Sequence, residues 1–432
     1  MDHSSRSRPT RFAALLAVAA LTATGCSSGD SADADGPVTL TVAGWSIATT
    51  PEFKLLAESF EKTNPDVTVE IKEYDAANYD TQMTADLSAG SAPDLYPIKC
   101  LCTFSTYQGG GQLLDVSDVA EGLDETVKTA VEPYTVDGAS YAIPYREDGW
   151  YLFYNKDMFE QAKAELPNGQ WTWDNFAQAA QQLSTADGAD AGTYNHVWPS
   201  AVQGFANAQS ANGYQDFLAG NFAFMEPFYQ RALALQESGA AVDYNTATTN
   251  SLTYQSEFGT QKVPMMLMGS WYIGTLIAQQ ESGDAEKFEW GFAPAPQVDT
   301  STLDAPVTFG GPTGMGINAG IDENKVAAAK EFLTYISGAE GASTLAEIGI
   351  TPANTSETVA ESLFSVEGVP TDELSRSTFT NHVIRPEVPV SENTATINTI
   401  LTDAHTAIMS GSSDVTGALE KAKQEFGNQI GN

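Results

Sequence analysis

The segment 38–98 switches hydrophobic period repeatedly, and this limits the folds that are open to the chain. Runs of alternating β-forming residues are separated by runs whose apolar residues recur every three or four positions. This pattern predicts strands separated by helices. Because a helix between two strands is the usual crossover of a parallel sheet, we predict βαβ units and an α/β fold. The predicted elements are a strand over Val38–Val42, a helix opened by Pro51, a strand over Val67–Tyr74, a helix over Asn78–Leu87 and a strand over Leu95–Ile98.

Further elements are predicted along the rest of the 432-residue chain. Trp150–Tyr154 consists of β-forming residues without alternation, so we expect a strand that is buried on both faces. Residues 187–215 and 297–306 lack periodicity and are predicted to be loops. The other predicted elements are a helix over Phe176–Leu183, a strand over Val263–Met268, a strand and turn over Trp290–Pro296, a turn-rich loop leading into a strand over Gly310–Asn318 and a helix over Glu323–Ile336.

The N-terminal residues have the composition of an export signal. Three arginines precede an apolar run over Phe12–Leu21, which is too short to span a bilayer as a mature helix. Small residues then lead to Cys26 in a pattern that resembles a bacterial lipobox, where the cysteine becomes the lipidated first residue. We therefore predict a signal peptide over 1–25 and a tether over 26–36 that is lipid-anchored to the outer face of the cell membrane. The alternative is ordinary secretion with an incidental cysteine.

The chain is strongly acidic, with 56 Asp and Glu residues against 20 Lys and Arg residues and a formal net charge of −36. Nucleic acids and anionic membrane surfaces are therefore poor partners, because few basic side chains are present to neutralise phosphates. The acidic excess has two interpretations: a solvated surface that keeps an exported protein soluble, which we favour, or attraction of a cationic solute. After the signal, no stretch of the sequence is long and apolar enough to span a membrane.

The 3 cysteines exclude a disulfide-dense scaffold. With Cys26 assigned to the lipid, Cys100 and Cys102 remain, either as a disulfide, which an exported protein can keep, or as two buried thiols. No metal site is predicted, because no histidine has ligand spacing to these cysteines. The sequence contains no Gly-x-Ser-x-Gly, His-Glu-x-x-His or Walker A signature, and we predict neither a cofactor nor an enzymatic activity.

Short motifs spread over residues 38–355 follow one another in the order that is typical of a single family. No motif alone is specific to that family, and it is their order along the chain that indicates the family. They are Ala92-Pro93-Asp94-Leu95, Ile143-Pro144, Tyr154 to Phe159, Trp171-Thr172-Trp173, Gly269-Ser270-Trp271, Gly310-Gly311 with Ile317-Asn318, and Ala328 to Phe332. The chain resembles the extracytoplasmic solute-binding proteins of ABC importers, and among them the large sugar-binding family that includes maltose-binding protein.

The resemblance implies a two-lobed fold of the periplasmic-binding-protein type. Each lobe would be a mostly parallel sheet flanked by helices, with the ligand cleft between the lobes. Chain crossovers are expected near Arg146–Gly149, after about Trp290, and within or just after the predicted helix over Glu323–Ile336. We expect one lobe to consist of residues 37–147 plus 294–335, and the other of residues 148–293 plus 336–432.

The resemblance also implies a function. The protein would be a monomeric, non-catalytic receptor that captures a mono- or oligosaccharide by cleft closure and delivers it to the transmembrane subunits of an ABC permease. Two alternatives remain open. The solute could be a glycerophosphodiester, a polyol or a peptide, or the chain could be an exported glycosidase that uses paired carboxylates.

A sugar presents hydroxyl groups and apolar C–H faces, so its site needs polar side chains beside aromatic rings. We expect these residues at the carboxyl ends of strands, where open α/β sheets bind ligands. The candidate ligand-binding residues are Trp45 and Ser46 after the first strand, Lys99 after the third, Arg146, Glu147 and Asp148 at the predicted crossover, Trp271 after the Val263–Met268 strand, Gly310 and Gly311 where a backbone must approach closely, and also Trp198 and Arg385.

Several candidates have a purely structural alternative. Trp45 could pack beneath a loop, and Lys99 could be a solvated loop residue. Trp271 could belong to the core. Asp148 could form a salt bridge with Arg146 instead of binding a solute, because such a cluster of charges can satisfy itself.

Overall fold

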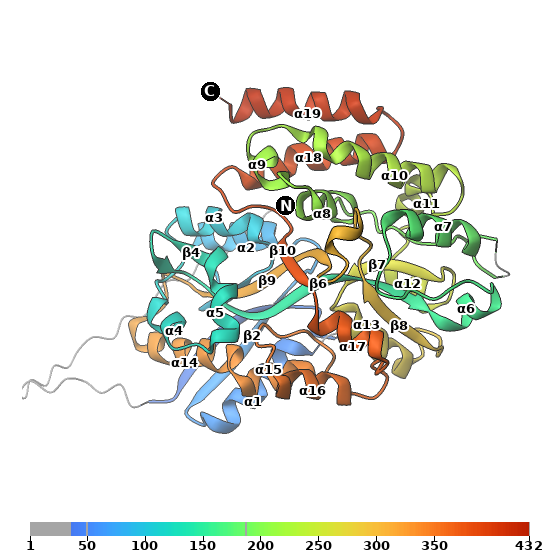
Figure 1. Cartoon of the computed structure of the whole chain (residues 1–432). Helices are drawn as coiled ribbons and strands as arrows, with labels where there is room; N and C mark the ends of the chain where they lie inside the picture. The colour runs from blue at the N-terminus through green and yellow to red at the C-terminus, as the bar shows by residue number, and fades with distance from the viewer. Residues whose placement is uncertain (1–35, 49–50, 186–187, 432) are drawn as a thin grey trace, which may run out of the picture. The chain divides into compact units, whose positions relative to one another are not determined.

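A computed structural model describes the chain over residues 36–48, 51–185 and 188–431 (Figure 1). The chain divides into two units, Met1–Gly36 and Pro37–Asn432, and the elements described below all belong to the second unit. The predicted signal peptide, the lipidated Cys26 and nearly all of the tether lie outside the described residues. Within the described part of the chain, no helix is long and apolar enough to cross a membrane.

The predicted βαβ units are present at the start of the fold. β1 (Val38–Trp45) pairs in parallel with β2 (Val67–Tyr74) and β3 (Leu95–Ile98), and the last two strands have the predicted limits. The apolar residues of the first helix recur at helical spacing, and these residues are buried. The connecting helices are α1 (Glu52–Thr63) and α2 (Tyr79–Ala89).

The main sheet has the strand order β2-β1-β3-β9-β6-β7, and in addition β10 pairs with β9 and β8 pairs with β6. β6 is the longest strand, and it is buried along nearly its whole length, as the absence of alternation in Trp150–Tyr154 predicts. The strands not yet introduced are β6 (Ile143–Asn155), β7 (Met265–Gly269), β8 (Trp290–Pro294), β9 (Val307–Ile317), β10 (Val383–Pro386) and the separate pair β4 (Thr135–Val136) and β5 (Ala139–Ser140).

The fold is of the predicted α/β class, but the direction of the strands differs from a mostly parallel sheet beyond β3. β6 is antiparallel to β7, β8 and β9, and β3 is antiparallel to β9, whereas β9 and β10 are parallel. The long helical connections around β6 can return the chain in either direction. A buried strand without alternation gives no signal for its direction, so the sequence could not reveal this difference.

β9 passes through the stretch for which the sequence predicts a turn-rich loop. The strand runs continuously from Val307 to Ile317. A Cβ atom on Gly310 would lie 1.8 Å from the carbonyl oxygen of Asp148 in β6. Glycine is therefore needed here to let two backbones approach, which is why turn-forming residues occur inside a strand.

The predicted loop over 187–215 contains α8 (Ser200–Gln209) and the beginning of α9 (Gly213–Leu218). α8 is buried from Val202 to Ala208, including its polar residues. A helix that is buried all round lacks the one-sided apolar pattern by which a sequence reveals a helix.

The remaining helices surround the sheet, and α18 packs against α19 and α10 at one end of it (Figure 1). Single 3-10 turns occupy Glu132–Tyr134, Phe222–Met225, Thr300–Thr302 and Glu323–Lys325. The other helices are α3 (Leu101–Gly109), α4 (Ser117–Glu121), α5 (Glu125–Val131), α6 (Lys156–Gln161), α7 (Trp173–Leu183), α10 (Glu226–Glu237), α11 (Tyr244–Thr249), α12 (Tyr254–Gly259), α13 (Tyr272–Ser282), α14 (Val326–Ser337), α15 (Ala339–Ala346), α16 (Glu357–Ser365), α17 (Glu373–Thr380), α18 (Thr394–Met409) and α19 (Val415–Gln429).

The buried apolar residues fall into separate cores on either side of the middle of β6. Two clusters draw on residues up to Tyr145 and on residues from Met315 to Ala353, whereas the largest cluster begins at Trp150. The chain therefore passes from one core to the other within β6, and again within β9 between Phe309 and Met315. The residue limits of the two lobes stay a prediction.

His405 is a buried titratable group in the larger core, where it is 1% exposed. Its Nδ1 atom lies 3.2 Å from the hydroxyl oxygen of Tyr229, and its Nε2 atom has no hydrogen-bond partner in the described part of the chain. Burial lowers the pKa of His405 to about 4. The ring is therefore neutral in the folded protein at neutral pH.

We expect His405 to make the protein sensitive to acid. An unfolded histidine has a pKa of about 6.5, so below that pH the unfolded chain takes up the proton first. The free energy of unfolding should then fall by up to ~3 kcal/mol as the pH decreases from about 6.5 to about 4. Urea unfolding of the protein and its His405→Gln variant measures this contribution. The stability advantage of histidine over glutamine should shrink towards acid pH, and a constant difference would contradict the assignment.

Candidate ligand-binding site

Arg146 is the centre of a buried charge network at the point where β6 passes between the two cores. Its Nη1 atom lies 2.6 Å from Oε2 of Glu52, which is in the first turn of α1. Its Nη2 atom lies 2.8 Å from Oδ2 of Asp148, and its Nε atom donates to the same oxygen at 2.9 Å. One guanidinium group therefore binds two carboxylates, from α1 and from β6.

Hydroxyl groups extend this network into the part of the fold that follows β7. Ser270 Oγ donates to Oδ1 of Asp148 at 2.9 Å, and Thr351 Oγ1 donates to Ser270 Oγ at 2.6 Å. All of these residues are buried. We call Glu52, Arg146, Asp148, Ser270 and Thr351 the Arg146 network.

The electrostatics of the network follow from burial and from close opposite charges. Burial raises the pKa of Glu52, although the nearby Arg146 acts in the opposite direction. Burial alone would lower the pKa of Arg146, but the charges of Asp148 and Glu52 outweigh this effect and raise it. Arg146 is therefore permanently charged, and its charge is used within the protein.

Four aromatic side chains form a cluster beside this network: His196, Trp198, Tyr254 and Trp271, which we call the aromatic cluster. The ring centroids of Trp198 and Trp271 are 6.5 Å apart, and those of His196 and Tyr254 are 5.3 Å apart. Trp198 is 40% exposed, while Tyr254 and Trp271 are half-buried.

Sequence adjacency and electrostatics both relate the aromatic cluster to the Arg146 network. Trp271 directly follows Ser270, at the start of α13. Burial raises the pKa of Tyr254, and the positive charge of Arg146 acts on the same hydroxyl in the opposite sense. Aromatic faces and hydrogen-bonding groups thus meet in one place, which is the combination that a small polar solute with apolar faces requires.

Trp45 and Lys99 lie on the opposite core from the aromatic cluster. The ring of Trp45 packs edge-on against Phe53 at 4.9 Å, and Lys99 Nζ lies 5.2 Å above it. Lys99 Nζ also donates to the carbonyl oxygen of Ala76. The pKa of Lys99 is lowered, first by desolvation and also by the charge of Arg146, so these two basic groups are close. Ser46 follows Trp45 with a φ of 54°.

Gly310 and Gly311 are brought to the network by strand pairing, opposite Gly149 and Asp148 respectively. The close approach that the sequence predicts at Gly310 is made by the backbone of β6. Nothing in this geometry requires a solute at either glycine.

Glu147 is separated from its two charged neighbours. Adjacent residues of a strand point to opposite faces, so Glu147 faces away from Arg146 and Asp148. Burial, followed by the charge of Asp148, raises the pKa of Glu147 to about 7. Arg146 and Asp148 therefore lie on one face of β6, and Glu147 lies on the other.

Arg385 belongs to β10, where it pairs with Phe309, and its Nη1 atom donates to the carbonyl oxygen of Ala208 at 2.6 Å. The structure does not bring Arg385 to the Arg146 network.

Cys100 and Cys102 are joined by a disulfide at the start of α3. Among the described residues, no group of three or more His, Cys, Asp or Glu side chains could hold a metal ion.

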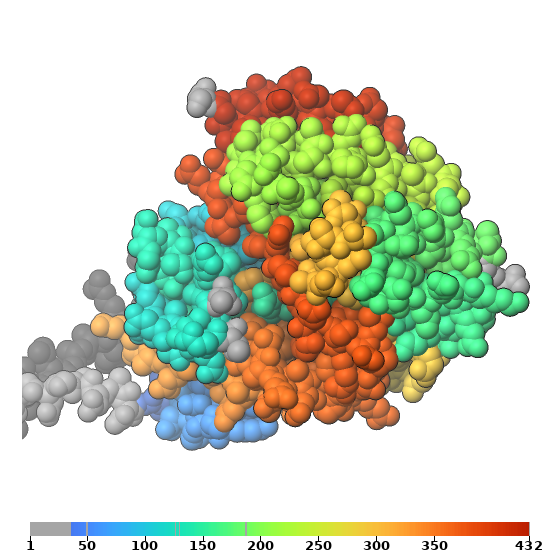
Figure 2. Space-filling view, in the orientation of Figure 1, coloured from blue at the N-terminus to red at the C-terminus, as the bar shows by residue number. Residues whose placement is uncertain are grey.

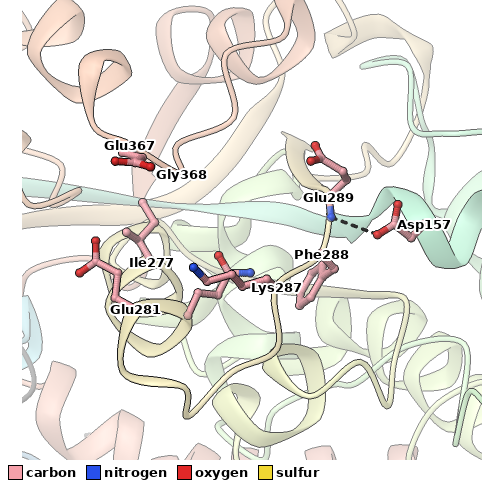
Figure 3. A pocket seen from close by; sticks show the side chains of 9 residues that line it. Asp157, Ile277, Glu281, Lys287, Phe288, Glu289, Glu367 and Gly368 are labelled. Atoms are coloured by element: carbon pink, nitrogen blue, oxygen red, sulfur yellow. Dashed lines mark hydrogen bonds between the residues drawn. The ribbon is translucent and has the colours of Figure 1, made fainter.

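The surface is hollowed between the α4–α5 region and the segment from β10 to α17, and atoms of β6 and β9 are visible at the base of this hollow (Figure 2). A separate pocket contains none of the candidate residues. There, acidic side chains surround Lys287, and the backbone N–H of Glu289 donates to Asp157 at 3.1 Å (Figure 3). The residues that line it are Asp157, Ile277, Gln280, Glu281, Lys287, Phe288, Glu289, Glu367 and Gly368.

Sequence reasoning missed Glu52, His196, Tyr254, Ser270 and Thr351. A signal existed for Ser270, which stands in the quoted Gly269-Ser270-Trp271 motif. The other four residues carried no signal in the sequence. Glu52, for example, lies 94 positions from Arg146 in sequence and meets it only in the folded protein.

The family of bacterial extracellular solute-binding proteins matches the chain over residues 45–343, which contain most of the candidate site. The chain belongs to this family. Its members bind solutes, and the match covers elements of both cores.

Individual relatives agree with this assignment. A binding protein of Brucella abortus is 32% identical over 167 residues, which are 38% of this chain and 39% of that protein, so the match spans well under half of that relative. The lactose-binding protein of Rhizobium radiobacter is 23% identical over 354 residues, covering 78% of this chain and 77% of that protein. A solved sugar transporter of Rhizobium etli, in an open conformation, is 29% identical with a TM-score of 0.76, covering 91% of this chain and 99% of that chain. The two-lobed fold class is therefore confirmed.

Proposed function

We propose that this solute-binding protein captures a neutral mono- or oligosaccharide between the aromatic cluster and the Arg146 network. The single observation that carries the proposal is the place of Trp271, which lies near Trp198 at a centroid distance of 6.5 Å and directly follows Ser270, the residue that donates to Asp148. Indole rings cover the apolar face of a pyranose, while the side chain of Asp148, which is 11% exposed, accepts from one of the sugar's hydroxyl groups. The names of the Rhizobium radiobacter and Rhizobium etli relatives support a sugar as the solute.

The partners of the basic candidates support a neutral solute. Arg146 is bound by two carboxylates, Lys99 donates to a backbone carbonyl group and so does Arg385. Arg146 is neutralised by its carboxylates and Arg385 lies away from the Arg146 network, so among the three candidates this leaves a phosphate only the charge of Lys99 near the network. A glycerophosphodiester is therefore disfavoured, because a buried phosphate needs several charge-assisted hydrogen bonds.

The proposed mechanism uses the two cores as rigid bodies. The solute first stacks on the aromatic cluster, and rotation about β6 and β9 then brings the Trp45 side of the site over it. The closed form is favoured only by contacts that the solute completes. The protein then releases the unchanged solute to an ABC permease, while Cys26 anchors the monomer through lipid at the outer face of the membrane.

A thermal-shift and calorimetry screen with lactose, maltose, D-mannitol and chito-oligosaccharides tests this proposal. A sugar present at a hundred times its Kd should stabilise the protein by about 2.7 kcal/mol. Stabilisation by D-mannitol but by no ring-containing sugar would favour a polyol, which lacks a face to stack. Release of monosaccharides during incubation would identify a glycosidase instead. No shift with any compound would contradict the proposal.

A further inference from the structure

His196 lies inside the aromatic cluster, although only its aromatic neighbours resemble a sugar-binding surface. It follows Tyr194, which forms a bridge with Met266 of β7, and it precedes Trp198 by two positions. The ring centroid of His196 is 5.7 Å from that of Tyr194 and 4.3 Å from that of Trp198.

The hydrogen bonds of Tyr194 determine which nitrogen of His196 carries the proton. The Tyr194 hydroxyl donates to the carbonyl oxygen of Leu252 at 2.9 Å, and it also lies 2.9 Å from Nδ1 of His196. A phenol has a single proton, and a carbonyl oxygen can only accept. Both contacts are satisfied only if Nδ1 of His196 donates to Tyr194. The proton therefore sits on Nδ1, and Nε2 carries a lone pair.

This lone pair is not used within the described part of the chain, where Nε2 of His196 has no hydrogen-bond partner. Unlike Nε2 of His405, it is also not completely enclosed. The residue as a whole is 9% exposed, so Nε2 is partly open to a small molecule. Burial lowers the pKa of His196 to about 4, so the imidazole is neutral at neutral pH and Nε2 stays an acceptor.

We infer that Nε2 of His196 accepts a hydrogen bond from one hydroxyl group of the bound sugar and thereby determines which sugars are bound. This inference rests on the proposed function. Stacking on Trp198 and Trp271 discriminates weakly, because most pyranoses have an apolar face. A fixed acceptor at one position is directional, and a sugar without a hydroxyl there would leave it unpaired. Tyr194 is the positioning residue that holds the required tautomer.

Two substitutions of His196 separate its two nitrogen atoms. In His196→Asn, the side-chain amide can take over the bond from Nδ1 to Tyr194 but provides nothing at the position of Nε2. In His196→Gln, the longer side chain places an amide oxygen near the position of Nε2. Calorimetry is done with the member of the sugar panel that binds the unaltered protein most tightly. We expect roughly tenfold weaker binding for His196→Asn and recovery to within about threefold for His196→Gln.

A purely structural role of His196 predicts a different outcome. Both variants would then lower the melting temperature of the unliganded protein and weaken binding equally, and this result would overturn the inference. Unchanged affinity in His196→Asn would also overturn it. If that variant does not fold, Tyr194→Phe frees the tautomer and should weaken binding roughly threefold; no change in affinity there would overturn the inference. Absence of sugar binding by the unaltered protein would instead refute the proposed function, and this inference with it.

Discussion

Replacing Trp271 by alanine is expected to weaken sugar binding by roughly 10- to 100-fold. Burying an aromatic side chain against an apolar surface contributes ~1.5–3 kcal/mol, and every 1.4 kcal/mol corresponds to about tenfold in affinity. Trp271 lies between Trp150, at a centroid distance of 6.0 Å, and Trp198. One part of its ring therefore packs on the core, and the rest is available to a solute. Calorimetric titration with the best sugar of the panel measures the loss.

The matched control for this experiment is Trp171→Ala. Trp171 is also half-buried against the larger core, where it packs against Phe159 at 6.5 Å, but it has no contact with the aromatic cluster. Both variants should lose some stability without ligand, because each leaves a cavity. Only Trp271→Ala should lose affinity. An equal effect of both variants on binding would show that Trp271 acts through the core alone.

Replacing Arg146 by methionine is expected to cost about 3–5 kcal/mol of unfolding free energy, the largest loss of stability that we predict. The substitution leaves Glu52, which is 1% exposed, without its cation. Asp148 keeps only its bond from Ser270. An unpaired buried carboxylate is costly because its desolvation is no longer offset by an opposite charge. Urea unfolding at neutral pH measures this loss.

Two further variants test the cause of that loss. Lys330→Met breaks the ion pair between Lys330 and Asp118, in which the Asp118 side chain is 63% exposed. This variant should lose no more than ~1 kcal/mol of unfolding free energy. Combining Glu52→Gln with Arg146→Met removes the stranded charge and should recover part of the stability. Equal losses in Arg146→Met and Lys330→Met would contradict a buried network.

The loss in Arg146→Met should also depend on pH. Burial already raises the pKa of Glu52, and removing Arg146 takes away the main influence that lowers it. A carboxyl group whose folded pKa is raised destabilises the fold at pH values above its unfolded pKa, and this cost vanishes once the group is protonated. The variant should therefore be less impaired at about pH 5 than at about pH 8. A loss that grows towards acid pH would refute this explanation.

Particular elements show where sequence reasoning worked. β2 and β3 have the predicted limits because turn-forming residues precede each strand and each strand carries a local pattern of β-forming or apolar residues. α8 was not predicted, because burial on all sides removes amphipathicity, and β9 was not recognised at Gly310 because a glycine in a strand and a glycine in a turn look alike. A local sequence pattern indicates the structure of its own segment, but it does not indicate which other segments pack over that segment.

The candidate site divides in the same way. Asp148 is predicted from the crossover that the family resemblance implies near Arg146–Gly149, and Trp271 is predicted from the Gly269-Ser270-Trp271 motif and the end of the Val263–Met268 strand. Tyr254 and Thr351 carry no such mark, since they complete the site from distant helices and loops. The disulfide between Cys100 and Cys102 was one of two open alternatives.

The sequence by itself determined the α/β class and the order of the first strands and helices. It also contains the motifs by which the chain resembles solute-binding proteins. All of these depend on neighbours within a few positions. Only the tertiary structure decided that the charge of Arg146 is used internally, that Glu147 faces away from it, and that Tyr194 fixes the proton of His196. Hydrogen bonds and burial depend on atoms that are far apart along the chain, and these atoms meet only once the chain has folded.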